Sequence, residues 1–386
     1  MSRSIRRYYV CLAITILLCT ASLPAEDADR IVAIADVHGD LDTLTALLRK
    51  TALIDAAGHW SGGKATLVQT GDLVDRGPKS RAVLDLLMTL QKEAPRRNGG
   101  VRVSLGNHEV MNIIGDLRYV VPEDYAAFAD ARSEQRRRSA LQNYSRIQAA
   151  RGLRPDEAAW LQAHPLGFVE HREAFGPEGV YGRWLRSLPA MNIVGDSIFL
   201  HGGIAPEFAE GWTVEKINAT IRTEIQAFDR IKQYLVDRKL ALPFFTLDEM
   251  ADAAQAELTL RKSKPQAEQE EEGRQHIQIL EQFLALGGWL TIREEGPLWF
   301  RGYDRWTDEE GETHLARLTQ ALKVKRIVVG HTPQANGEIR SRFGGKVFLI
   351  DTGMLSGYFK GGRASALEMS AGHVRAIYPS GQVELN

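Results

Sequence analysis

The stretch Gly71-Asp72-Leu73-Val74-Asp75-Arg76-Gly77 decides the fold of this chain. It holds two carboxylates three residues apart and an arginine, and glycines close it at both ends. The run Thr66-Leu67-Val68 leads into it, and a helical pattern follows Pro78. A strand that ends in a tight loop and then opens a helix is where α/β proteins collect ligands. The stretch therefore predicts a binding loop at the end of a buried strand.

Four other segments place polar side chains where an apolar run ends. They are Asp36-Val37-His38-Gly39, Gly106-Asn107-His108-Glu109, His201-Gly202-Gly203 and Gly330-His331. Strands are expected over 31–35, 66–68 and 101–105, and helical leucine spacing follows the first two. Repeated strand-loop-helix units with right-handed crossovers bring such loops to one edge of a sheet. We therefore expect an α/β fold with these polar loops gathered at one edge.

Two long segments interrupt this pattern. Residues 116–187 and 212–290 are charged and helix-like. Further strands are expected over 197–200, 326–329 and 347–350. We interpret the two segments as helical insertions in one catalytic domain over residues 30–386, and we expect them to form a cap over the shared sheet edge.

The N-terminus has the layout of a signal peptide over residues 1–25. Arg3, Arg6 and Arg7 precede an apolar run over 8–19, and small residues follow. The run is shorter than the roughly 20 apolar residues that a membrane span needs; an uncleaved anchor is the alternative. We expect a periplasmic or secreted protein with no stable membrane insertion after cleavage.

Composition narrows the function further. The chain has 386 residues and a net charge of −1, so no global field attracts nucleic acid or a membrane surface. Both cysteines, Cys11 and Cys19, lie in the signal segment. We therefore expect no nucleic-acid partner, no disulfide, no thiol nucleophile and no thiolate metal site in the mature chain.

The polar loops offer ligands for two divalent metal ions. Aspartate, histidine and asparagine suit hard or borderline metals, with manganese as first choice and iron or zinc as alternatives. The expected ligands are Asp36, His38 and Asp72 for one ion and Asp72, Asn107, His201 and His331 for the other. Asp72 would bridge both. Two ions about 3.5–4 Å apart lower the pKa of a bridging water, and the hydroxide would attack phosphorus in line with the leaving group.

Three further residues are assigned to catalysis and substrate binding. His108, next to Asn107, is placed to protonate the leaving group. Asp75 is its expected counter-charge. Arg76 offers a planar fork for phosphate oxygens, and Asn107 is also expected to contact the substrate.

Each motif alone is weak, because turns favour aspartate and glycine for local reasons. Five in this order, each after an apolar run, are a specific signal. The remaining histidines lack this context and are interpreted as surface or packing residues: 59, 164, 171, 276, 314 and 373.

The ordered set of five motifs resembles the phosphoprotein phosphatase branch of the calcineurin-like metallophosphoesterases, from about residue 31 to about residue 353. The resemblance implies two mixed β-sheets packed face to face and flanked by helices, with a dinuclear metal centre. It also implies a second arginine on the phosphate. Arg301, in Gly296-Pro297-Leu298-Trp299-Phe300-Arg301, is the candidate.

Three differences from the usual family motifs indicate which branch of the family this chain resembles. Ala35 stands where the family usually has glycine, Asp351-Thr352-Gly353 replaces the Ser-Ala-Pro-Asn-Tyr segment of the eukaryotic enzymes, and Gly330-His331-Thr332-Pro333 replaces the Ala-His-Gln type of ending. With the export signal, these features resemble the Shewanella-like protein phosphatases of bacterial type. That resemblance implies phosphoprotein or phosphopeptide substrates, with phosphotyrosine, phosphoserine or phosphothreonine as the ester. We expect a monomer.

Two other functions stay open at this point. An exported nucleotide phosphohydrolase of the symmetrical diadenosine tetraphosphatase type shares the Asp-Arg-Gly and Gly-His-Thr-Pro features. A non-catalytic binding module on a degenerate phosphatase fold would lack a ligand or His108, and neither is missing here. Pro333 stands where a phosphodiesterase would carry a second histidine, which disfavours that class.

Overall fold

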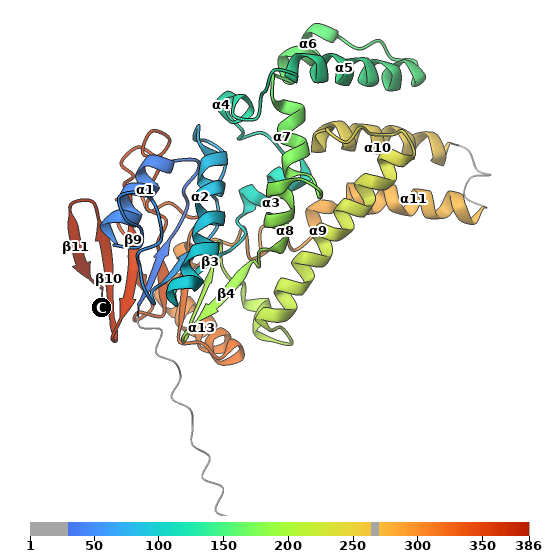
Figure 1. Cartoon of the computed structure of the whole chain (residues 1–386). Helices are drawn as coiled ribbons and strands as arrows, with labels where there is room; N and C mark the ends of the chain where they lie inside the picture. Colours follow the sequence, from blue (N-terminus) through green and yellow to red (C-terminus); the bar gives the residue numbers. More distant parts are fainter. Residues whose placement is uncertain (1–29, 264–269, 386) are drawn as a thin grey trace, which may run out of the picture.

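The computed structural model describes residues 30–263 and 270–385. Two mixed β-sheets pack together, with helices around them (Figure 1). The first sheet has six strands in the order β11-β10-β9-β1-β2-β3: β1 (Ile31–Ile34), β2 (Thr66–Gln69), β3 (Gly100–Val103), β9 (Ala366–Ser370), β10 (His373–Tyr378) and β11 (Gly381–Glu384). The second has five in the order β4-β5-β6-β8-β7: β4 (Met191–Val194), β5 (Ser197–Leu200), β6 (Arg326–Val329), β7 (Arg340–Arg342) and β8 (Val347–Leu349). The predicted two-sheet architecture is confirmed.

The six predicted strands all form, and the strands that carry the polar loops run parallel. β1 pairs with β2, and β2 pairs with β3, so their loops leave from the same edge. In the second sheet β5, β6 and β8 are also parallel. His201 and His331 therefore follow neighbouring strand ends, as Asp36 and Asp72 do.

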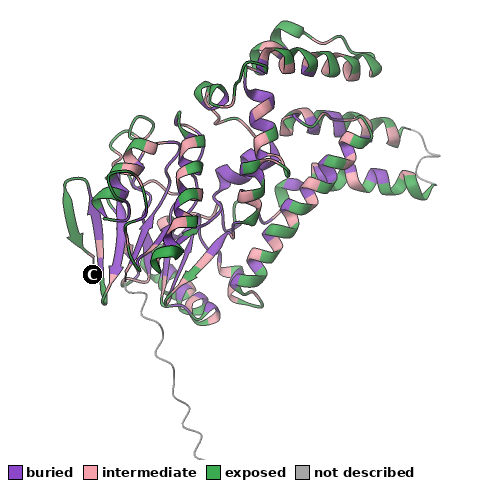
Figure 2. Ribbon diagram, in the orientation of Figure 1, coloured by how far each residue is buried: buried purple, intermediate pink, exposed green. Residues whose placement is uncertain are grey.

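Strand β1 shows why the sequence needs a continuous apolar run here. Ile31 and Ala33 belong to the core between the two sheets, whereas Val32 and Ile34 belong to the core beneath the helices. Side chains alternate across a strand, so a strand covered on both faces must be apolar at every position. Figure 2 shows the central strands largely buried, the edge strand β11 exposed, and the outer helices exposed along one face.

Helices cover the sheets and fill the two insertions. Beside the sheets lie α1 (Leu41–Lys50), α2 (Ser80–Glu93), α3 (Asn107–Ile114), α12 (Gly302–Arg305) and α13 (Asp308–Leu322). The first insertion contains α4 (Pro122–Ala126), α5 (Ser133–Ala150), α6 (Glu157–Ala163), α7 (Phe168–Phe175) and α8 (Val180–Ser187). The second contains α9 (Val214–Asp237), α10 (Leu247–Lys262) and α11 (Glu271–Leu284). Short 3₁₀ turns span η1 (Ala94–Arg97), η2 (Pro206–Ala209) and η4 (Leu286–Gly288).

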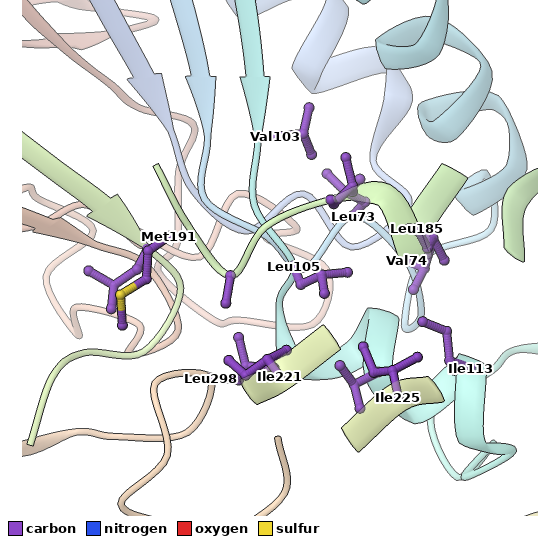
Figure 3. Packing of buried hydrophobic residues seen from close by; sticks show 14 of the residues in the cluster. Leu73, Val74, Val103, Leu105, Ile113, Leu185, Met191, Ile221, Ile225 and Leu298 are labelled. Atoms are coloured by element: carbon purple, nitrogen blue, oxygen red, sulfur yellow. The ribbon is translucent and has the colours of Figure 1, made fainter. Parts of the chain in front are cut away.

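The insertions share one hydrophobic core with the loops that carry the predicted site residues. Figure 3 shows part of this cluster, in which residues of the loop after β2 lie with residues of α3, α8 and α9: Leu73, Val74, Ile113, Leu185, Ile221 and Ile225. The helices are therefore packed against the loops that carry the site, and the site is held from that side.

The structure describes the C-terminal end of the chain but not the N-terminal segment. The predicted signal segment 1–25 lies outside the described residues. The C-terminal strands β9, β10 and β11 were not predicted, yet β9 pairs antiparallel with β1 in the middle of the first sheet. No helix in residues 30–263 and 270–385 is long and apolar enough to cross a membrane.

Gly71 provides a test of how tightly the loops are packed. Its φ is +101°, and an added Cβ would lie 2.5 Å from the backbone N of Gly106. We expect Gly71→Ala to lower the free energy of unfolding by about 2–4 kcal/mol, from backbone strain and the clash together. Gly58, with φ +89° and no atom within 4 Å of an added Cβ, is the matched control. Urea unfolding of both variants measures the difference; equal losses would show that the close approach of the loops is unimportant.

Candidate metal centre

Backbone hydrogen bonds lock the first two polar loops together. The amides of Val37 and His38 both donate to the carbonyl of Asp72, at 2.8 and 3.0 Å, and Gly39 donates to Leu73 at 2.9 Å. These bonds bring Asp36, His38 and Asp72 to one place, although the two loops follow different strands and a helix separates them in the chain.

Glu109 clamps the second and third loops. One carboxylate oxygen accepts from the amides of Asp72 and Gly106, both at 2.8 Å, and the other accepts from Leu73 at 2.8 Å. Glu109 is fully buried, and burial raises its pKa to about 7, with the nearby Asp72 adding to the shift. No role was predicted for Glu109; its place in the Gly-Asn-His-Glu motif was the available signal.

The backbone is strained where the loops meet. Among the described residues, eleven other than glycine have positive φ, and five of them belong to the predicted site: His38, Asp72, Asp75, Arg76 and His331. Such conformations cost about 1–3 kcal/mol each and persist where the surrounding structure enforces them. Their concentration here indicates a site selected for side-chain placement.

Three histidines each direct one ring nitrogen at a backbone carbonyl. His38 Nδ1 lies 3.0 Å from the carbonyl of Val74, and His201 Nδ1 lies 3.1 Å from that of Thr70. His331 Nε2 lies 3.1 Å from the carbonyl of Trp299. A carbonyl can only accept, so that nitrogen carries a proton, and the other nitrogen, once deprotonated, can offer its lone pair to a metal ion. This is the arrangement of metal-binding histidines.

Asp72 lies at the centre of these side chains. Its Oδ2 is 3.2 Å from His201 Nε2, 3.7 Å from His38 Nε2 and 3.8 Å from His108 Nε2. Burial would raise the pKa of Asp72, but the charges of His201 and His108 hold it well below its usual value. One carboxylate facing three histidines suits the predicted bridging position.

The remaining predicted ligands surround Asp72. Asn107 Oδ1 is 2.9 Å from His201 Nε2. Asp36 Oδ2 is 3.8 Å from His38 Nε2, and Asp36 Oδ1 accepts from the backbone amide of His331 at 3.0 Å. Two triads hold ligand atoms within 4.8 Å of one another: His38 with Asp72 and His108, and Asp72 with His201 and His331.

The charges of the site fit divalent cations. Asp36 is buried, and burial together with Asp351 raises its pKa well above the usual range. Burial also raises the pKa of Asp351 to about 6, and its Oδ2 has no hydrogen-bond partner. His201 lies among carboxylates, and although burial lowers its pKa, Asp72 and Asp36 raise it to about 9. Buried carboxylates facing histidine nitrogens need positive charge, and two divalent ions would supply it.

His108 and Asp75 form a buried pair. His108 Nδ1 is 2.6 Å from Asp75 Oδ2, and Asn112 Nδ2 donates to Asp75 Oδ1 at 2.8 Å. Burial alone would lower the pKa of His108, but Asp72 and Asp75 raise it. Asn112, one helical turn after His108 on α3, was not predicted; its spacing of four residues was the signal.

Arg76 is held over the site by aromatic rings. Its guanidinium lies 4.7 Å from the ring centre of Tyr358, 5.2 Å from Tyr119 and 5.4 Å from Phe359. Its Nη1 is 2.6 Å from His38 Nε2. Its Nε is buried and has no hydrogen-bond partner within residues 30–263 and 270–385. The guanidinium of Arg76 therefore lies beside the metal-binding histidines.

Arg301 approaches the same place from the second sheet. Its Nη1 donates to the carbonyl of His331 at 2.8 Å and contacts Thr332 Oγ1 at 3.3 Å. Asp36 and Asp351 lie near enough to affect its pKa, although burial has the larger effect and lowers it. The structure thus brings together all the predicted site residues, and none of the six other histidines joins them.

A comparison with protein families identifies the fold. Residues 29–335 match the model of the calcineurin-like phosphoesterase family. This chain belongs to that family. The predicted resemblance is confirmed, and the phosphoesterase fold accounts for the gathered loops of the two sheets.

Relatives of this phosphoesterase include the branch that the sequence predicted. This chain is 33% identical over 218 residues to Shewanella-like protein phosphatase 2 of Arabidopsis thaliana, and the match spans 53% of each chain. It is 28% identical over 365 residues to an uncharacterized protein of Schizosaccharomyces pombe, covering 92% of this chain and 82% of that one. A symmetrical bis(5′-nucleosyl)-tetraphosphatase of Neisseria meningitidis is 27% identical over 203 residues, or 53% of this chain and 52% of that one.

The phosphoesterase also resembles a solved structure over most of its length. The cold-active protein-tyrosine phosphatase of a psychrophilic Shewanella species matches with a TM-score of 0.59 and 25% identity. The match covers 93% of this chain and 80% of that chain. A match of that extent includes most of the two helical insertions as well as the sheets.

Proposed function

We propose that this phosphoesterase is a metal-dependent phosphoprotein phosphatase that hydrolyses phosphomonoesters. The observation that carries the proposal is the guanidinium of Arg76, whose Nη1 lies 2.6 Å from His38 Nε2 beside the cluster of Asp72 and the metal-binding histidines. A planar guanidinium suits the oxygens of a phosphate monoester. The names of the plant and Shewanella relatives support a phosphoprotein substrate.

The proposed reaction assigns a separate role to each group of site residues. Arg76 and Arg301 hold the phosphate oxygens, and Asn107 contacts the substrate from α3. His108, oriented by Asp75, donates the proton that the leaving oxygen needs. Asp36, His38, Asp72, Asn107, His201 and His331 hold two divalent ions, with manganese proposed and iron or zinc as alternatives. When bound, such ions activate water and neutralise phosphate charge.

A cavity beside Asn107 is suited to the leaving group. It has a volume of about 420 Å³ and lies between α3, α10 and the end of α11. Met111, Phe283 and Trp299 are among its apolar lining, and Asp116 and Arg118 stand among its polar residues. An apolar pocket with a few polar groups suits an aromatic side chain and its peptide flanks. The pocket supports phosphotyrosine as the preferred ester.

The test compares three substrates with the metal-loaded protein: a phosphotyrosyl peptide, a matched phosphoseryl peptide and diadenosine tetraphosphate. We expect phosphate release from the peptides, with the phosphotyrosyl peptide fastest. Hydrolysis of the dinucleotide alone would contradict the proposal and assign the protein to the nucleotide-hydrolysing class. No turnover of any substrate with two bound metals would favour a binding module.

Removing the metal should abolish turnover. The expected mechanism relies on the cations for activating water, and the proposed roles of Arg76 and His108 do not replace them. We expect dialysis against a chelator to stop phosphate release and added Mn²⁺ to restore it. Turnover above about a hundredth of the loaded rate after metal removal would contradict the mechanism.

We also propose that the chain is exported and works as a monomer. The observation behind export is the basic-then-apolar N-terminal layout of residues 1–25. Sequencing the N-terminus of protein recovered from the periplasmic fraction tests it. An intact Met1 on protein that stays in the cell interior would contradict export; the mass measured in solution tests the monomer.

A further inference from the structure

A second cavity lies within the helical insertions, between α7 and α9. Its volume is about 600 Å³, and none of the residues that line it belongs to the candidate metal centre. Ala174, Pro177 and Val236 give it apolar walls, and Arg172 and Lys232 line it as well. In Figure 1, α7 and α9 lie in the helical part of the molecule, beside the sheets.

Lys232 is a buried lysine without a partner. Its exposed fraction is 9%, and it makes no hydrogen bond or ion pair within residues 30–263 and 270–385. It belongs to the buried stripe of α9, together with Phe228, Ile231 and Leu235. Burial, followed by the charge of Arg172, lowers its pKa well below the usual range. A buried ammonium costs free energy unless an anion balances it.

The carboxylates near Lys232 are already bound by other residues. Arg186 holds both oxygens of Asp229, each at 2.8 Å. Arg136 donates to Glu170 at 2.7 Å. The charge of Asp229 raises the pKa of Lys232, but burial outweighs it, and neither acid forms an ion pair with Lys232 among the described residues.

The two remaining carboxylates stand at the rim. Glu178 has an exposed side-chain fraction of 95%, and Glu173 is an exposed residue. Neither group forms an ion pair with Lys232 among the described residues. They also repel a ligand that carries more negative charge than Lys232 can balance.

Arg172 adds a second cation but is held in place. Its exposed fraction is 2%, its Nη1 donates to the carbonyl of Asn112 at 2.5 Å, and its Nε has no hydrogen-bond partner. Burial lowers its pKa to about 10. Because Asn112 also orients Asp75, Arg172 ties α7 to the catalytic pair, and Lys232 is the cation that remains available to a ligand.

We propose that the cavity between α7 and α9 binds a small organic monocarboxylate, with its carboxylate on Lys232 and its apolar body against Ala174, Pro177 and Val236. The volume lies within the usual range for small-molecule sites, about 300–1,000 Å³. The rim carboxylates Glu173 and Glu178 disfavour a phosphate dianion. This site is separate from the metal centre and does not depend on the reaction catalysed there.

The test uses the full metal-loaded chain with benzoate and hexanoate as probes, and benzyl alcohol as the neutral counterpart of benzoate. Lys232→Met removes the charge at nearly constant volume. Lys64→Met, at an exposed lysine outside the cavity, is the matched control for net charge. Calorimetric titration measures the dissociation constants.

We expect saturable binding of a carboxylate to the wild type and to Lys64→Met, at least tenfold weaker binding to Lys232→Met, and no binding of benzyl alcohol. Lys232→Met should also melt at a higher temperature and keep the wild-type turnover, because it removes a buried amine that has no partner among the described residues and lies outside the metal centre. Equal binding to wild type and Lys232→Met would overturn the proposal. The proposal would also be overturned if neither carboxylate bound saturably up to about 10 mM. It would be overturned as well if inorganic phosphate displaced bound benzoate as effectively as hexanoate does.

Discussion

Asp72→Asn is expected to lower kcat/KM by about 10³-fold, equivalent to about 4 kcal/mol of transition-state stabilisation. Asp72 Oδ2 lies 3.2–3.8 Å from ring nitrogens of His38, His108 and His201, so this one oxygen is close to ligands expected for both ions. An amide keeps the shape but loses the negative charge, and its nitrogen cannot act as a ligand. Neither ion would then be held in its wild-type place.

Metal analysis of the purified variant provides the direct measurement. We expect the metal content of Asp72→Asn to fall below two ions per chain, in parallel with activity. Asp42→Asn is the matched control, because Asp42 has a side-chain exposure of 77% and pairs with Lys79 on the surface. Two ions per chain in Asp72→Asn would contradict the bridging role.

His108→Asn is expected to lower kcat by about 10²–10⁴-fold while leaving two ions bound. The pair that His108 forms with Asp75 is buried, and its Nε2 remains directed toward Asp72. A histidine whose other nitrogen is fixed by a carboxylate is suited to proton donation. The loss should be larger for an alkyl phosphate than for p-nitrophenyl phosphate, because an alkoxide needs the proton more.

Measuring the metal content of His108→Asn distinguishes a proton donor from a metal ligand, which the structure also allows. His108 Nε2 is 3.8 Å from Asp72 Oδ2, almost the same distance as His38 Nε2, so geometry alone would also allow it to be a ligand. Loss of one ion in His108→Asn would make it a ligand. A loss of activity that is the same for both leaving groups would exclude it as the proton donor. Asp75→Asn should show a smaller loss with the same leaving-group dependence.

The pair formed by His108 and Asp75 is also connected to the first helical insertion. Arg172 of α7 donates to the carbonyl of Asn112, and Asn112 donates to Asp75. A residue of the first insertion thus helps to position Asp75, the partner of the proposed proton donor His108. Changes in this insertion should alter kcat before they alter metal content.

The sequence by itself determined the parts that depend on local pattern. Apolar runs followed by polar loops predicted β1, β2 and β3 as parallel strands, since a strand buried on both faces must be apolar throughout. Parallel strands with right-handed crossovers share one loop edge, and this rule alone is enough to place Asp36, Asp72 and Asn107 near one another.

Only the tertiary structure decided the contacts between distant segments. The C-terminal strand β9 inserts beside β1, and neither its pairing nor the burial of Asp351 near Asp36 leaves a periodic signal in the sequence. Tyr119 and Tyr358 flank Arg76 although they lie far apart in the chain. Periodicity reports which face of an element is buried but not which element covers it, because that choice depends on packing among surfaces that are equally apolar.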